Sequence, residues 1–239
     1  MILYGIIDTF ASPILSYNIY YVNLIMHLFI LIKNYLALYL IDHGFVRAVY
    51  PNMHKVSEGL FRSSQPSPRQ LKNIKKKYGV KTIINLRGEN GLAAYKLEKK
   101  ACEELDLNLI NFRVYSRNPP QINEIKGLIE IYQMVEYPVL IHCKSGSDRT
   151  GIAAALYRIL ILNHTVKEAS NELHWSYGHI KTSHTGVLDY FLERYVSHSE
   201  KQKISFLDWV KDYDPVSLKN EFRSSRFMSL LFDKIIKRE

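Results

Sequence analysis

The sequence predicts an α/β fold in which a central, mostly parallel sheet is flanked by helices and preceded by an N-terminal apolar helix. Short β-branched runs typical of buried strands alternate with stretches that repeat apolar residues at helical spacing. Strands that alternate with helices in this way form parallel sheets covered by helices. The chain has 239 residues, enough for one good-sized domain and an extension.

Local signals place the individual elements along the chain. The predicted strands lie near 60–62 and over 81–86, 108–114 and 139–141, and the predicted helices lie over 67–78, 92–105, 121–136 and 150–162. Ser67 and Pro68 are typical of an N-cap and a first helical position, and Gly79 ends that helix. Thr165 and Glu168 form a capping box that starts another helix, and the chain from 184 onward is predicted to be helical.

The first forty residues differ from the rest of the chain. Residues 9–32 contain no Asp, Glu, Lys or Arg, and a helix of about 20 mostly apolar residues can cross a bilayer. Polar residues such as Asn23, His27 and Lys33 interrupt the run, so a packed N-terminal helix is the alternative. We predict a membrane anchor over 1–42 with a single N-terminal span. Basic residues after the span favour a cytoplasmic catalytic domain.

Composition restricts the partners and the metal chemistry. Lys and Arg number 32 against 23 Asp and Glu, giving a formal charge of +9. This balance favours anionic partners or serves general solubility. Two cysteines, Cys102 and Cys143, cannot form a disulfide framework, and the chain has no CxxC pair and no HExxH motif. We therefore predict no metal site and no cofactor.

The stretch HCKSGSDRTG, residues 142–151, follows a predicted buried strand and leads into a helix. The free N–H groups and the dipole at a helix start favour an anion, and such a loop can turn its amides inward as a nest. The same field lowers the pKa of Cys143 and makes it a thiolate, the nucleophilic form. Arg149 offers a planar fork for two phosphate oxygens. The stretch predicts a phosphate-binding cysteine loop, with a buried cysteine at a strand end as the alternative.

This loop resembles the signature of the cysteine-dependent protein tyrosine phosphatase superfamily, in its bacterial dual-specificity branch. The segments GLFRSSQPSPRQLKNIKKKYGVKTIINLRGE and SYGHIKTSHTGVLDYFLERY are similar to parts of the same branch. RNPPQINEIKGLIEIY resembles the helix before the signature in phosphatase-and-tensin-homologue lipid phosphatases. The resemblance covers roughly residues 43–225 and implies a dual-specificity phosphatase-like fold for a catalytic domain with these bounds. Residues 226–239 are predicted to form a C-terminal helical tail.

The resemblance implies a role for each residue of the loop. Cys143 would attack phosphorus, Arg149 would hold the equatorial oxygens, Thr150 would donate a hydrogen bond to sulfur, and His142 would support the loop. The expected substrate-binding residues are Lys144, Ser145, Gly146, Ser147 and Gly151. Among these, Lys144 could instead be a solvated lysine, the two serines could simply form the loop, and the two glycines permit close approach.

The proton donor for the leaving oxygen is absent from its usual place. Most relatives carry an Asp shortly before Asn-Pro-Pro, but NFRVYSRNPP contains no carboxylate. Asp148, beside Arg149, is similar to the loop acid proposed for myotubularin-type lipid phosphatases. We hypothesise that Asp148 protonates the leaving group. The alternative is that Asp148 orients Arg149 or caps the helix.

Two further features leave alternatives open. Cys102 could be packed in the core or could form a reversible disulfide with Cys143, as in the lipid-phosphatase relatives. His174, His179 and His184 form a loose histidine-rich stretch, which we expect to be structural or to line a rim rather than to bind a metal.

The predicted function is hydrolysis of phosphomonoesters through a phosphocysteine intermediate. The expected substrates are phosphotyrosine, phosphoserine or phosphothreonine in proteins, or a phosphoinositide or inositol phosphate. We expect association with a membrane and no nucleic-acid partner. The alternative is a catalytically weak pseudophosphatase that binds phosphorylated ligands at a membrane.

Overall fold

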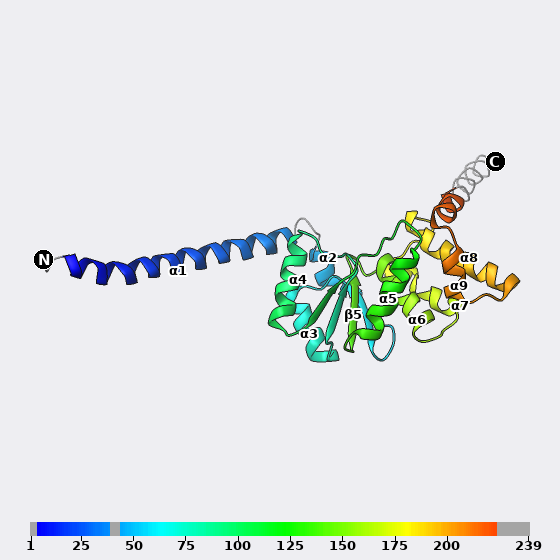
Figure 1. Cartoon of the computed structure of the whole chain (residues 1–239), viewed down its shortest axis with the longest axis horizontal. Helices are drawn as coiled ribbons and strands as arrows, with labels where there is room; N and C mark the ends of the chain where they lie inside the picture. Colours follow the sequence, from blue (N-terminus) through cyan, green and yellow to red (C-terminus); the bar gives the residue numbers. More distant parts are fainter. Residues whose placement is uncertain (1–3, 39–43, 224–239) are drawn as a thin grey trace.

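The computed structural model describes residues 4–38 and 44–223, and a five-stranded sheet in the order β1-β2-β5-β3-β4 lies at its centre (Figure 1). The strands are β1 (His54–Lys55), β2 (Leu60–Ser64), β3 (Thr82–Asn85), β4 (Asn108–Asn111) and β5 (Val139–Cys143). The β2, β5, β3 and β4 strands pair in parallel, whereas β1 runs antiparallel to β2. The prediction of a mostly parallel sheet in an α/β fold is confirmed. The two residues of β1 are too few to show a strand pattern in the sequence.

Helices cover both faces of the sheet (Figure 1). The α-helices of the described residues are α1 (Tyr4–Leu36), α2 (Gly44–Val49), α3 (Pro68–Tyr78), α4 (Ala93–Glu104), α5 (Ile122–Met134), α6 (Asp148–Leu160), α7 (Val166–Ala169), α8 (Val187–Gln202) and α9 (Phe206–Asp212), and residues 215–223 are also helical. Among them, α1 extends away from the sheet and contacts α4 (Figure 1). Three short 3-10 helices, η2 (Ser170–Glu172), η3 (Trp175–Tyr177) and η4 (His184–Gly186), join α7 to α8.

Side chains that alternate along the strands divide the core into two layers. Ile83 and Leu140 pack with α3 and α4 on one face, whereas the next residues, Ile84 and Ile141, pack with α5, α6 and α8 on the other. Both faces of these strands are therefore buried, which explains their continuous β-branched runs.

The helix starts predicted from capping residues are confirmed. Ser67 Oγ accepts a hydrogen bond from the Gln70 amide, and Gln70 Oε1 accepts one from the Ser67 amide, so α3 begins with a capping box. Gly79 ends α3 in the left-handed conformation, with φ +65°. Thr165 caps α7 in the same way as Ser67 caps α3.

The prediction of an N-terminal membrane span is wrong. A helix, α1, does occupy this part of the chain, and many of its apolar side chains from Tyr20 to Leu36 are exposed. Among the described residues, however, none of the helices combines the length and the apolar character that crossing a bilayer requires. Polar residues including Asn23, His27 and Lys33 break its apolar run. The membrane-anchored location with a single N-terminal span is corrected accordingly. The predicted tail at 226–239 lies outside the described residues.

Candidate active site

The loop between β5 and α6 lies at the carboxyl end of the middle strand of the sheet. Cys143 is the last residue of β5 and is 2% exposed, and α6 begins five residues later at Asp148. Parallel β2 and β3 flank β5, so the loop emerges where their carboxyl ends also meet. Open α/β sheets bind ligands at this edge.

The carbonyl groups of the loop are held by donors from outside it. The Gln65 amide donates to Lys144 O (3.3 Å), Asn52 Nδ2 to Ser145 O (2.9 Å), and Arg62 Nη2 to Gly146 O (2.9 Å) and Ser147 O (3.3 Å). In a planar trans peptide the carbonyl and the following N–H point in opposite directions. Because four successive carbonyls turn outward, the amides of residues 145–148 turn toward the inside of the loop. This is the arrangement of an anion-binding nest.

Arg62 braces the loop from inside the protein. Its side chain is fully buried, and Nη1 lies 2.8 Å from Glu172 O and 2.6 Å from Glu172 Oε2. Arg158 Nε donates to the other carboxylate oxygen of Glu172 at 2.6 Å. The ring of Tyr177 lies 3.9 Å from the guanidinium carbon of Arg62. A buried cation with these partners is compensated, so it can hold the loop carbonyls in place.

His142 lies behind the loop in a second buried network. Its Nε2 is 2.6 Å from Glu98 Oε1, and both side chains are fully buried. Gln65 Nε2 donates to the second oxygen of Glu98 at 2.8 Å, and Arg87 in turn donates to Gln65 Oε1. The position of His142 is compatible with the supporting role expected of it.

Two glycines of the loop have no room for a side chain. Gly146 has φ +76°, and a Cβ there would lie 2.6 Å from the backbone of Ser63 and Ser64. A Cβ on Gly151 would lie 2.7 Å from Glu172 O. The loop and the first turn of α6 therefore pack directly on the backbones of neighbouring segments.

The surroundings of Cys143 favour the thiolate. Burial acts to raise the pKa of the thiol, but the charge of Arg149, the hydroxyl and amide of Thr150 and the amide of Gly146 together lower the pKa below its usual value. Thr150 Oγ1 is buried and has no nitrogen or oxygen partner among the described residues, so its hydroxyl is available to the sulfur. A nucleophile, an arginine and inward amides thus share one loop.

The side chain of Asp148 points to a histidine. Its side chain is 26% exposed, and Oδ1 lies 2.7 Å from Nδ1 of His179. His179 Nε2 lies 2.6 Å from Asp189 Oδ2 on α8. Burial raises the pKa of Asp148, but hydrogen bonds from His179 and Thr185 outweigh it and lower the pKa. The same two carboxylates raise the pKa of His179 to about 9 against the effect of burial.

Other carboxyl and thiol groups lie outside this cluster. Glu124, the nearest acid after the Asn-Pro-Pro turn, accepts a hydrogen bond from the Gln121 amide and caps α5; burial raises its pKa. Cys102 packs with α3 and α4, on the opposite face of the sheet from the core cluster that contains Cys143. Both cysteines are free, and burial raises the pKa of Cys102 to about 12. This placement favours the packed-core interpretation of Cys102 over a disulfide with Cys143.

Sequence reasoning missed several residues that shape the loop: Asn52, Arg62, Glu98, Glu172 and Asp189. It noted His179 without linking it to Asp148. The signal that could have found Arg62 is a charge directly after Leu60 and Phe61 in a short strand, because a buried charge needs a partner. No local sequence pattern marks the other four residues as partners of the loop.

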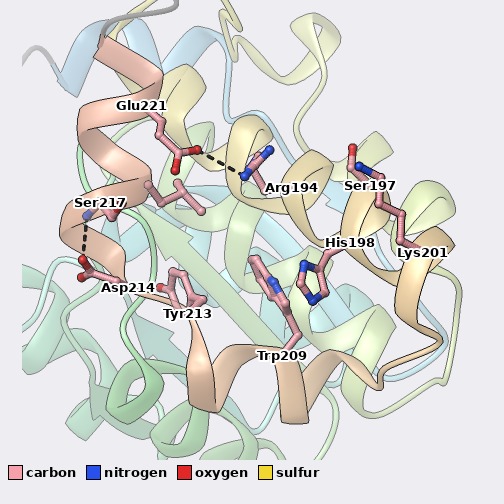
Figure 2. Close-up of a pocket in the computed structure, with 10 residues that line it drawn as sticks. Arg194, Ser197, His198, Lys201, Trp209, Tyr213, Asp214, Ser217 and Glu221 are labelled. Carbon is pink, nitrogen blue, oxygen red and sulfur yellow. Dashed lines mark hydrogen bonds and ion pairs between the residues drawn. The ribbon is translucent and has the colours of Figure 1, made fainter.

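A separate cavity of about 240 Å³ lies between α8, α9 and the helix at 215–223 (Figure 2). Trp209 and Tyr213 form part of its wall, and Arg194 and Glu221 pair across it at 3.4 Å. No residue of the cysteine loop lines it, so the cavity is a feature of the C-terminal helices and not of the candidate active site.

The fold and the loop define the class of protein: a cysteine-dependent protein tyrosine phosphatase of the bacterial dual-specificity type. Within that class the chain belongs to the family described as PTP-NADK, "DSP-PTPase phosphatase fused to NAD+ Kinase", whose model matches residues 45–186. The matched range contains the whole strand, loop and helix that carry Cys143 and Arg149.

Curated relatives match the same region. The dual specificity protein phosphatase TpbA of Pseudomonas aeruginosa strain PAO1 is 29% identical over 140 residues, which are 56% of this chain and 60% of the relative. TpbA of strain UCBPP-PA14 is 24% identical over 134 residues, 54% of this chain and 57% of the relative. The chain thus spans about three fifths of the length of the curated relatives it matches.

Solved structures are similar at low identity. The crystal structure of P. aeruginosa TpbA is 20% identical and aligns over 71% of this chain and 89% of that one, with a TM-score of 0.48. The crystal structure of PTPMT1 is 18% identical and aligns over 63% of this chain and 99% of that one, with a TM-score of 0.47.

Proposed function

We propose that the chain hydrolyses phosphomonoesters through a phosphocysteine intermediate. The observation that carries this proposal is the loop itself: a buried cysteine with a lowered pKa lies at the centre of inward amides and next to Arg149. These groups provide a nucleophile and a charge-matched cradle for one phosphate.

In the first step the Cys143 thiolate attacks phosphorus, a sulfur–phosphorus bond forms, and the bond to the leaving oxygen breaks. Arg149 and the amides of residues 145–148 hold the phosphoryl oxygens as charge develops on them. Asp148 gives the leaving oxygen its proton, in keeping with its position at the loop and its partial exposure. In the second step water attacks the phosphocysteine, and Thr150 supports departure of the sulfur by donating a hydrogen bond to it.

The substrates we propose are phosphorylated tyrosine, serine or threonine in proteins, with phosphoinositides or inositol phosphates as the second class. The curated relatives carry the name dual specificity protein phosphatase, which supports testing phosphopeptides first. The formal charge of +9 suits any of these anionic substrates.

The test is release of inorganic phosphate from an aryl phosphate by the purified chain. We expect turnover in the wild-type protein, its abolition in Cys143→Ser, and its retention in the matched variant Cys102→Ser. A folded wild-type protein that releases no phosphate contradicts the proposal and favours the pseudophosphatase alternative. A panel that compares phosphopeptides with phosphoinositides then separates the two substrate classes by their kcat/KM.

A further inference from the structure

The side chains of Asp148, His179 and Asp189 form a hydrogen-bonded triad that runs from the cysteine loop to α8. His179 lies in the middle, with Nδ1 2.7 Å from Asp148 Oδ1 and Nε2 2.6 Å from Asp189 Oδ2. The exposed fraction of the side chain is 26% for Asp148, 1% for His179 and 12% for Asp189. Asp148, which belongs to the cysteine loop, is therefore the most exposed member of this triad, and His179 is shielded from solvent.

Two carboxylates on one imidazole determine where the protons are. Both ring nitrogens lie within hydrogen-bond distance of a carboxylate oxygen, and an imidazole can donate from both nitrogens only when it is protonated. The pKa of His179, about 9, agrees with this geometry. At neutral pH the resting site thus has a protonated His179 and an unprotonated Asp148.

This resting state raises a difficulty for leaving-group protonation. A carboxylate held at a lowered pKa has no proton of its own to give. A proton does lie one hydrogen bond away, on Nδ1 of His179. The 115–120 segment before α5 contains no carboxylate that could supply another.

We propose that His179 is the positioning residue that stores the proton for Asp148, and that Asp189 holds His179 in place for this task. This inference rests on the proposed phosphatase function. As the bond between phosphorus and the leaving oxygen breaks, the Nδ1 proton moves to the Asp148 carboxylate and Asp148 delivers a proton to the leaving oxygen. His179 is then neutral and still donates from Nε2 to Asp189. When water attacks the phosphocysteine, the proton that it loses returns through Asp148 to Nδ1, which restores the starting state.

The groups packed around Asp148, His179 and Asp189 do not change the protonation state inferred for His179. Ser147 Oγ lies 3.4 Å from Asp148 Oδ1, and Thr185 also bonds to the Asp148 side chain. Beyond Asp189, Lys181 interacts with the Asp189 charge and pairs with Glu193 at 2.5 Å. The opposite charges of this pair largely cancel, so the two carboxylates are the groups that raise the pKa of His179 against the effect of burial.

The experiment measures kcat against pH for two substrates that differ in their leaving groups. A phosphoserine peptide has a leaving oxygen that needs a proton, whereas p-nitrophenyl phosphate has one that needs little help. For the wild-type protein we expect kcat on the peptide to persist through neutral pH and to fall near pH 9, as His179 loses its proton.

The variant His179→Asn keeps a donor near Asp148 but has no proton to transfer. We expect its kcat on the peptide at pH 7.5 to fall by roughly 10²-fold, and its kcat on the aryl ester to change by only a few-fold. Asp189→Asn keeps His179 but removes one charge, so the fall near pH 9 should move down by about one pH unit. His174→Asn, an exposed change in the same stretch, should leave both profiles as they are.

Equal losses on both substrates in His179→Asn, with an unmoved pH profile in Asp189→Asn, would mean a purely structural role and would overturn the proposal. If His179→Asn does not fold, the wild-type protein still gives an answer: NMR titration of the His179 ring must show a midpoint well above the ordinary 6.5, and a midpoint at or below it overturns the proposal. Wild-type turnover of the aryl ester reports the phosphatase function by itself, so the two proposals can fail separately.

Discussion

Gly146→Ala should disable the cysteine loop, while the same substitution at Gly79 should not. Both glycines have positive φ, +76° and +65°, so each alanine carries a similar backbone cost of roughly 1–2 kcal/mol. The surroundings differ. A Cβ at Gly79 has nothing within 4 Å, whereas a Cβ at Gly146 lies 2.6 Å from backbone atoms of Ser63 and Ser64.

The displacement that Gly146→Ala forces can be worked out from these contacts. Ordinary contact begins at 3.4 Å, so the loop or β2 must move by 0.8 Å, the difference between 3.4 and 2.6 Å. Because β2 is paired along its length with β5, the loop is the part that yields. A misplacement of about 1 Å at reacting groups costs about 10²-fold in rate.

The assay is kcat/KM on an aryl phosphate, together with thermal unfolding of both variants. We expect Gly79→Ala to keep its activity and to lose about 2–4 °C in Tm for each kcal/mol of destabilisation. Gly146→Ala should lose activity by about 10²-fold. Comparable activities in the two variants, with matching shifts in Tm, would refute the reasoning that the loop is held against the β2 backbone.

Three other predictions concern buried charge and protonation. Arg62→Met leaves the Glu172 carboxylate buried next to Arg158 alone and strips two loop carbonyls of their donor; urea denaturation should show a loss of about 3–5 kcal/mol, and a loss below about 1 kcal/mol would contradict it. Because folding raises the pKa of His179 from 6.5 to about 9, its contribution to stability is complete below pH 6.5 and disappears as pH rises through about 9. The free energy of unfolding should therefore fall over that window by roughly 1–3 kcal/mol in wild-type protein but not in His179→Asn, and equal slopes for the two proteins would count against the raised pKa. Iodoacetamide at neutral pH should label Cys143 before Cys102, whose pKa of about 12 leaves almost no thiolate; mass spectrometry that finds equal labelling would contradict this order.

Local and short-range features of the fold could be predicted from the sequence. Ser67, Pro68 and Gly79 specify the ends of α3 through groups within a few residues of one another, and the structure has them as expected. The strand, loop and helix around Cys143 were recognisable because the whole motif lies within one continuous stretch. Helix and strand ends differ by a few residues from the expected ones, as in β4, which stops at Asn111.

Contacts between distant segments could not be predicted. Arg62 and Glu172 are 110 residues apart, and Asp148 and His179 are 31 apart, so no periodicity or local motif links the partners. The histidine-rich stretch around His179 looked structural because its carboxylate partners come from two other segments. The N-terminal span was predicted from composition. Whether a helix can cross a membrane depends on the polar residues that interrupt its apolar run as well as on its length.

The ion pair between Arg62 and Glu172 has a consequence for protein synthesis. The ribosome releases β2 long before it releases η2, so a nascent chain has the arginine for some time without the glutamate. Until residue 172 has emerged and folded back, an unpaired cation at this position cannot be buried, and the carbonyls of Gly146 and Ser147 lack the donor that Arg62 provides. The cysteine loop therefore takes shape only when most of the domain is already in place. A nascent or truncated chain that ends before residue 172 would contain the whole HCKSGSDRTG stretch and yet remain inactive.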